Sequence, residues 1–126
     1  MNEVENEIQQ LEDTIEECRK LVARGDVLRR LMNNPDFNSL IEEDYLREER
    51  IRLGGLVGSP NTGIKQEDVI TDLAGTAALQ RYLSLVLHLA NAGKDQIEQA
   101  EQEILSLREE MANGVSGVVH DSEEDF

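Results

Sequence analysis

The sequence predicts an all-α protein, an elongated three-helix antiparallel arrangement with a coiled-coil arm and a disordered acidic C-terminal tail. Apolar residues recur in steps of three and four over long stretches, and no proline interrupts residues 66–111. Only 3% of the 126 residues are aromatic. Because aromatic side chains supply much of the buried area of a compact core, this chain has to bury many small aliphatic contacts along its helices.

The first helix is expected over about residues 2–32. Its apolar residues form a narrow heptad stripe, namely Val4, Ile8, Leu11, Ile15 and Cys18, continued after a stammer-like phase shift by Leu21, Gly25, Leu28 and Met32. Acidic residues fill the other faces of the first half, and basic residues come later, which suits the helix dipole. Gly25-Asp26 leaves the end of this helix open between Arg24 and Met32.

A second helix is expected over about residues 35–57. Asn34 suits the N-cap, Pro35 the first helical position and Asp36 the positive end of the dipole. Gly54-Gly55 leaves the extent of this helix open, and the composition of residues 58–63 predicts a loop.

The third helix is expected over about residues 66–112, continuous through Gly75 and Gly93. Apolar and small residues follow strict steps of three and four at Leu83, Val86, Ala90, Gly93, Ile97, Ala100, Ile104, Leu107 and Met111. We predict that its C-terminal half pairs with the first helix in a seam that includes Ile8, Leu11, Ile15, Leu83, Val86, Ala90, Ile97, Ala100, Ile104 and Leu107. A small head should form around Phe37, Leu40, Ile41, Tyr45, Leu73, Leu79 and Tyr82. Residues 1–112 would then be one helical domain.

Residues 113–126 are expected to form a flexible acidic tail, because Gly114 and Gly117 disfavour helix and the carboxylates repel one another. The tail is either a partner-binding segment or a solubilising appendage. In the first case the binding residues are Asp121, Glu123, Glu124, Asp125 and Phe126.

The formal net charge of −15 disfavours direct binding to nucleic acid or to anionic membranes, both of which depend on Lys and Arg. A protein partner with a basic or apolar surface is expected instead. The single cysteine, the lack of a signal-peptide pattern and the shortness of the most apolar run, residues 83–90, predict a soluble cytoplasmic protein. A long apolar stripe also predicts a homo-oligomer, with a dimer favoured.

No motif in the sequence predicts catalysis, a cofactor or a metal. The helical Glu-x-x-His pairs of di-metal bundles do not occur, and His88 falls on the outward face of its helix. Cys18 has basic neighbours that would lower a thiol pKa, but its place in the heptad stripe favours a core residue. The glycines before Lys65 do not complete a phosphate-binding pattern. We therefore expect that the protein is not an enzyme.

Residues 21–53 resemble small acidic helical proteins encoded by tailed bacteriophages. The resemblance lies in the Asn34-Pro35-Asp36-Phe37 turn, the acidic helix with Tyr45, a segment like Leu79-Gln80-Arg81-Tyr82-Leu83, and a Glu-rich coiled coil. It spans about residues 12–110, and Gly54-Gly55 departs from the pattern. The resemblance implies a phage origin, among head-morphogenesis genes, and location in the host-cell cytoplasm or in the virion.

From these observations we expect a non-enzymatic assembly factor or chaperone-like adaptor that acts through helix-mediated contacts. Two alternatives remain open. One is an acidic inhibitor or DNA mimic of a host nucleic-acid-binding enzyme, and the other is a minor virion structural component.

Overall fold

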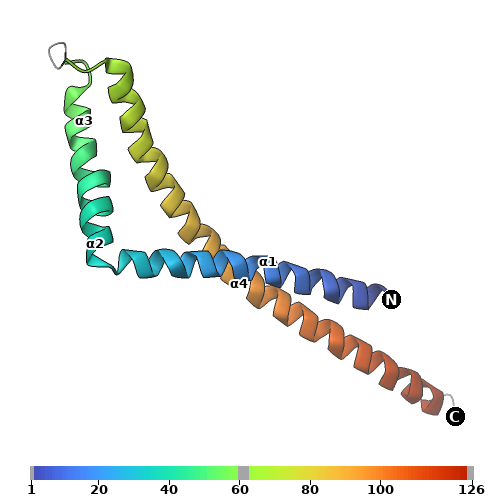
Figure 1. Cartoon of the computed structure of the whole chain (residues 1–126). Coiled ribbons are helices and arrows are strands. Elements are labelled where there is room, and N and C mark those ends of the chain that lie inside the picture. The colour runs from blue at the N-terminus through green and yellow to red at the C-terminus, as the bar shows by residue number, and fades with distance from the viewer. Residues whose placement is uncertain (1, 60–62, 125–126) are drawn as a thin grey trace. The chain divides into compact units, whose positions relative to one another are not determined.

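The computed structural model describes residues 2–59 and 63–124, with side chains described through residue 114. In that part of the chain the elements are α1 (Glu3–Met32), α2 (Pro35–Phe37), η1 (Asn38–Glu49), α3 (Arg50–Leu56) and α4 (Gln66–Glu124), and no strand occurs (Figure 1). Since α2, η1 and α3 follow one another without a break, the chain has three helical segments and is about 92% helical. The predicted all-α class is confirmed.

Two compact units divide the chain, and each contains parts of both long helices. The arm comprises Met1–Val22 and Ala90–Phe126, and the head comprises residues 23–89. The two units are described separately below.

In the arm, α1 and α4 pack against each other and bury a narrow apolar seam. The two helices cross and diverge toward the chain termini (Figure 1). Ile15, Ala100 and Ile104 form its buried cluster, and Ile8, Leu11 and Ile97 pack against this cluster.

Gly93 lies at a close approach of the two helices in the arm. A Cβ atom at this position would lie 3.2 Å from the carbonyl oxygen of Cys18 and 3.5 Å from Cγ2 of Val22. The Cys18 thiol donates a hydrogen bond to Oε1 of Gln96 at 3.1 Å, and Arg108 forms an ion pair with Glu12 at 3.3 Å. The absence of a side chain at Gly93 therefore allows the backbones to pack closely.

The head core forms where η1 and α3 pack against the first half of α4. Val69 and Leu53 are buried, and Thr76 is fully buried. The hydroxyl group of Thr76 donates to the carbonyl oxygen of Leu73 at 2.7 Å, so its burial leaves no polar group unsatisfied. A Cβ atom at Gly75 would meet the Tyr45 hydroxyl at 3.5 Å, an ordinary contact distance.

The π-helical segment η1 was not expected from the sequence. Along η1 and the one residue on either side of it, half-buried residues recur in pairs every four positions, at 37–38, 41–42, 45–46 and 49–50. This period is longer than the 3.6 residues of an α-helix. The wider turn moves Leu40 outward, and this side chain is 64% exposed. Tyr82 is also 53% exposed, because Leu79, Leu83 and Val86 form the inward face of α4. The prediction that Leu40 and Tyr82 belong to the head core was therefore wrong.

Side-chain caps fix two of the helix boundaries in the head. The Asn34 side chain accepts hydrogen bonds from the backbone amides of Asp36 and Phe37, with Pro35 in the first turn, as the sequence predicted. At the other boundary, Gly58 and Gly63 have φ values of +76° and +70° and allow the chain to turn. Gln66 ties this turn together. Its Nε2 atom donates to the carbonyl oxygen of Leu56 at 3.0 Å, and its Oε1 atom accepts from the amide of Gly58 at 2.8 Å.

The helix boundaries settle two points that the sequence left open. The first helix continues through Gly25 to Met32, and the second continues through Gly54 and Gly55 to Leu56. The third passes through Gly75 and Gly93 and is helical to Glu124, twelve residues beyond the expected end. The flexibility of residues 113–126 stays a prediction.

Candidate interaction surface

The predicted seam residues divide between the two units. In the arm, Ile15, Ala90, Ala100 and Ile104 are buried, and the remaining ones are half-buried, namely Ile8, Leu11, Ile97 and Leu107. In the head, Val86 is buried and Leu83 is half-buried. The sequence missed the continuation of this stripe toward the N-terminus of α4, where Val69 and Thr76 are the most deeply buried side chains. Thr76 occupies a seam position, and because threonine is polar, the apolar pattern did not include it.

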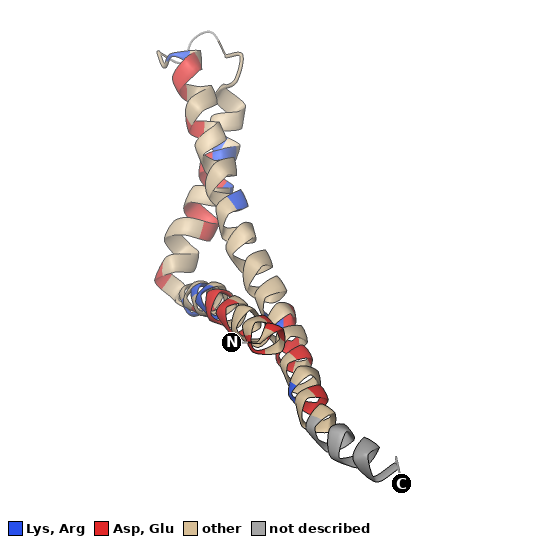
Figure 2. Ribbon diagram, turned by 90° about the vertical axis from the view of Figure 1, so that its right-hand side faces the viewer, with Lys and Arg blue, Asp and Glu red and all other residues tan. Residues whose placement is uncertain are grey.

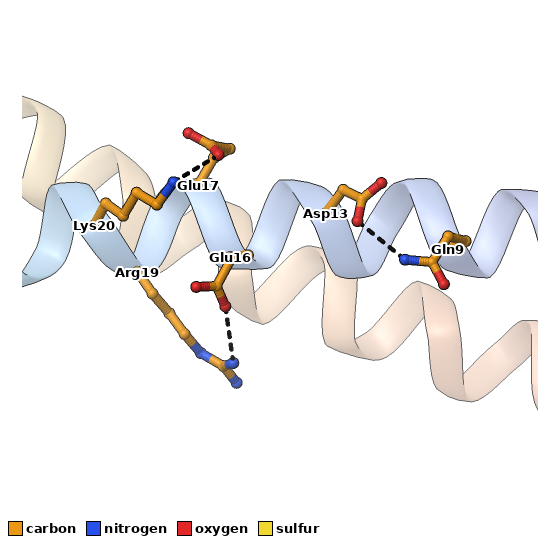
Figure 3. A network of polar contacts seen from close by, with 6 residues as sticks. All are labelled: Gln9, Asp13, Glu16, Glu17, Arg19 and Lys20. Carbon is orange, nitrogen blue, oxygen red and sulfur yellow. Dashed lines mark hydrogen bonds and ion pairs between the residues drawn. The ribbon is translucent and has the colours of Figure 1, made fainter.

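The outer surface of the arm is covered by charged and polar side chains that pair along the helix. On α1, Lys20 pairs with Glu17 at 3.0 Å and Arg19 with Glu16 at 3.9 Å (Figure 3). The hydrogen bond from Lys20 to Glu17 raises the pKa of Lys20. These exposed pairs lie one turn apart on one helix and contribute little to stability.

Acidic charge is concentrated in the arm. It contains 17 acidic and four basic residues, a net charge of −13, whereas the head contains ten acidic and eight basic residues, a net charge of −2. Within α4, residues 73–94 contain no acidic residue, and Figure 2 shows this stretch without red. The negative charge therefore lies mainly in the arm, and the head is nearly neutral.

Large apolar side chains are exposed almost entirely in the head. Of the ten exposed in the described residues, nine belong to the head, and Leu105 is the one in the arm. The head has more large apolar residues than the arm, 24 against eleven among the described residues, but this does not explain the difference. Nine of the 24 are exposed in the head, and one of the eleven is exposed in the arm. The exposed head residues are Val27, Leu31, Leu40, Ile51, Val57, Ile64, Ile70, Tyr82 and Leu85.

Part of this apolar surface forms a continuous stripe along α4. Ala78, Tyr82 and Leu85 are exposed and Leu89 is half-buried, and their spacing of four, three and four places them on one helix face. We call these four residues the outer stripe. It runs beside the inward-facing positions that pack on the head core, so α4 carries two adjoining apolar faces here.

Two open grooves border α4 in the head. The first, of about 450 Å³, is lined by the apolar side chains of Met32, Leu46, Leu83 and Leu87, with Glu42, Arg47, Gln80 and Ser84 as its polar residues. The second, of about 620 Å³, shares Gln80 and Ser84 with the first and is lined also by Arg50, Ala77, Arg81, Leu85 and His88. Leu85 thus belongs both to the outer stripe and to the second groove.

The arginines of the head differ in their pairing. Arg52 donates to the Glu49 carboxylate at 3.0 Å, and this hydrogen bond lowers the pKa of Glu49. Arg47 pairs with Glu48 at 3.3 Å. Arg50 donates instead to the side-chain amide of Gln80, a neutral acceptor. Neither Arg50 nor Arg81 forms an ion pair with any carboxylate in the described residues.

The sequence also drew attention to Cys18, His88, the acidic clusters and the tail. Cys18 is buried against Gln96, and His88 is exposed. Among the described side chains, no three His, Cys, Asp or Glu residues lie close enough together to hold a metal ion. None of the helices over residues 2–59 and 63–124 has a stretch that is both long and apolar enough to span a bilayer. The side chains of Asp121, Glu123, Glu124, Asp125 and Phe126 lie outside the described residues.

Comparison of the chain with protein-family models, with curated proteins and with solved structures finds no match.

Proposed function

We propose that this chain is a non-enzymatic adaptor, an assembly factor or chaperone-like protein that covers an apolar surface of a protein partner with its head. One observation carries the proposal. Nine of the ten exposed large apolar side chains among the described residues lie in the head, and two of them, Tyr82 and Leu85, belong to the outer stripe on α4. Soluble proteins rarely expose contiguous apolar surface without a binding function.

The distribution of charge supports the same assignment. An adaptor needs an apolar patch rimmed by charge, and the head combines the outer stripe with arginines and a net charge of only −2. The arm, with a net charge of −13, keeps such a molecule soluble and attracts partners with basic surfaces. Encounter would be fast at low ionic strength and slower when salt screens the charge.

The cellular setting of this proposal rests on the sequence resemblance alone. The resemblance to acidic helical proteins of tailed bacteriophages implies a head-morphogenesis factor that acts in the host-cell cytoplasm or in the virion. A homodimer formed through the outer stripe would bury it between two copies, so the same experiment also measures the oligomeric state.

One observation favours a second candidate, an acidic inhibitor or DNA mimic. Such a protein needs carboxylates held rigidly along one surface, and the arm presents its acidic residues from two long helices. This candidate would act through the arm, whereas the adaptor would act through the head. The two candidates are therefore separated by variants of each unit.

Affinity capture from the cells that make the protein tests the proposal. The parent chain is compared with a head variant, Tyr82→Glu with Leu85→Glu, and with the arm variant Leu105→Glu. Circular dichroism checks that both variants stay helical, and light scattering reports their oligomeric state. We expect the same captured protein with the parent and the arm variant, and its loss with the head variant. Equal capture by all three chains would reject the head as the binding unit.

A further inference from the structure

The second groove of the head differs from the rest of the molecule in its charge. The chain carries 27 acidic and 12 basic residues, yet this groove is lined by Arg50, Arg81 and His88 and by no carboxylate. A smaller neighbouring groove, of about 330 Å³, shares Arg50 and is lined also by Leu46, Arg47 and Ile51. Together these residues form a surface that we call the arginine groove.

Its apolar residues and its cations lie on both sides of the groove. Ile51, from α3, is 65% exposed, and Leu85, from α4, is 48% exposed. Arg50 and Arg81, one on each helix, form no ion pair with a described carboxylate, so their charge is available to a ligand. Arg47 is different, because Glu48 already neutralises part of its charge.

We infer that the arginine groove binds an acidic amphipathic helix of a partner protein. An apolar face of that helix would cover Ile51 and Leu85, and carboxylates beside this face would pair with Arg50 and Arg81. Amphipathic helices commonly bind in apolar grooves through residues spaced three and four apart. Arginine suits the rim because its planar guanidinium group binds carboxylates in a bidentate manner.

Charge complementarity decides between this ligand and the other occupants. A basic helix would place like charges beside Arg50 and Arg81 and is disfavoured there. A nucleic acid would also meet these cations, but it has no aliphatic face to cover Ile51 and Leu85. The inference rests on the proposed function, since it names the chemistry of a partner that the head binds.

Four probes test the inference by fluorescence anisotropy with the full chain. The first is a labelled peptide of about 18 residues, long enough for five helical turns, with leucines on one face and glutamates on the other faces. The second is the same peptide with lysine in place of glutamate, and the third has the composition of the first in scrambled order. The fourth is a single-stranded oligonucleotide of similar length.

We expect the acidic amphipathic peptide to bind more tightly than the other three probes. Substituting Arg50→Gln or Arg81→Gln should weaken its binding about fivefold or more, because arginines at the centre of an interface often dominate binding. Arg24→Gln is the matched control. Arg24 is exposed in the head but does not line the groove, so this variant changes the net charge equally and should bind like the parent.

Four outcomes would overturn the inference. Equal binding of the scrambled or basic peptide would show that no amphipathic acidic helix is selected. Tighter binding of the oligonucleotide would make the groove a nucleic-acid site. Equal losses in Arg24→Gln and Arg81→Gln would show a general charge effect. If none of the probes binds while the head variant still loses its captured protein, the arginine groove is rejected and the adaptor function stands.

Discussion

The arm and the head share the two long helices, and the head also contains α2, η1 and α3, but the two units leave different surfaces uncovered. In the arm, α1 and α4 close one narrow seam, and acidic residues cover the outside. In the head, α4 carries two adjoining apolar faces, and only one of them packs against the core. A heptad stripe alone therefore predicts which residues pair, whereas the second stripe beside it is the surface on which we propose that a partner binds.

The largest expected effect comes from a charge in the seam of the arm. Ile104 is buried against Ile15 and Ala100, so Ile104→Asp should place an unpaired carboxylate there and lower the free energy of unfolding by about 3 kcal/mol or more. Leu105→Asp is the control, since the neighbouring side chain is 59% exposed. Thermal unfolding followed by circular dichroism measures both. A parent-like melting temperature for Ile104→Asp would mean that the seam is misassigned.

The next effect concerns the close approach at Gly93. Gly93→Leu should lower the free energy of unfolding by about 1–3 kcal/mol, because its Cβ atom would already lie 3.2 Å from the Cys18 carbonyl oxygen and the larger side chain has no space between the helices. Urea unfolding measures the change. Unchanged stability would show that the helices of the arm can separate at this point without loss.

The head should respond in the opposite direction at Gly75, one of its helical glycines. Gly75→Ala places a Cβ atom 3.5 Å from the Tyr45 hydroxyl, an ordinary contact, and removes the entropic cost of glycine within a helix. We expect the free energy of unfolding to rise by about 0.5–1 kcal/mol. Destabilisation in the same urea experiment would indicate that η1 packs on α4 more tightly than this distance implies.

The smallest effect concerns the exposed pair of Arg52 and Glu49. In the folded protein the pKa of Glu49 lies below its ordinary value because Arg52 donates a hydrogen bond to the carboxylate. The pair therefore contributes stability above the unfolded-state pKa, and this contribution is lost as the pH falls through the folded-state pKa. Arg52→Gln should raise the pKa of Glu49, as measured by NMR titration, with little change in melting temperature. An unchanged pKa would mean that the pair does not form in solution.

Sequence periodicity was sufficient for the long helices but not for the head. The lack of proline over residues 66–111 and the steps of three and four from Leu83 onward predicted continuous helix through Gly75 and Gly93. The Asn34-Pro35 signal predicted the start of the second helix. The pattern misplaced Leu40, because it assumes 3.6 residues per turn and η1 has a wider turn. It misplaced Tyr82 because α4 has two adjoining apolar stripes, and spacing alone does not show which of them faces the core.

The interaction surface was the least predictable feature. Arg50 and Arg81 are 31 positions apart in the sequence, and they line one groove because α3 packs beside α4. The role of Gln66 in closing the turn before α4 likewise depends on three backbone groups that only the fold brings together.

Site-specific photo-crosslinking tests the central claim, that the head and not the arm carries the binding surface, most directly. A photo-reactive amino acid is placed at Leu85, in the outer stripe, or at Leu105, the exposed apolar residue of the arm. After irradiation of the cells that make the protein, crosslinked species are separated by mass and identified. We expect Leu85 to yield a discrete crosslink to another polypeptide and Leu105 to yield none. Crosslinks from Leu105 alone, or equal crosslinks from both positions, would contradict the account.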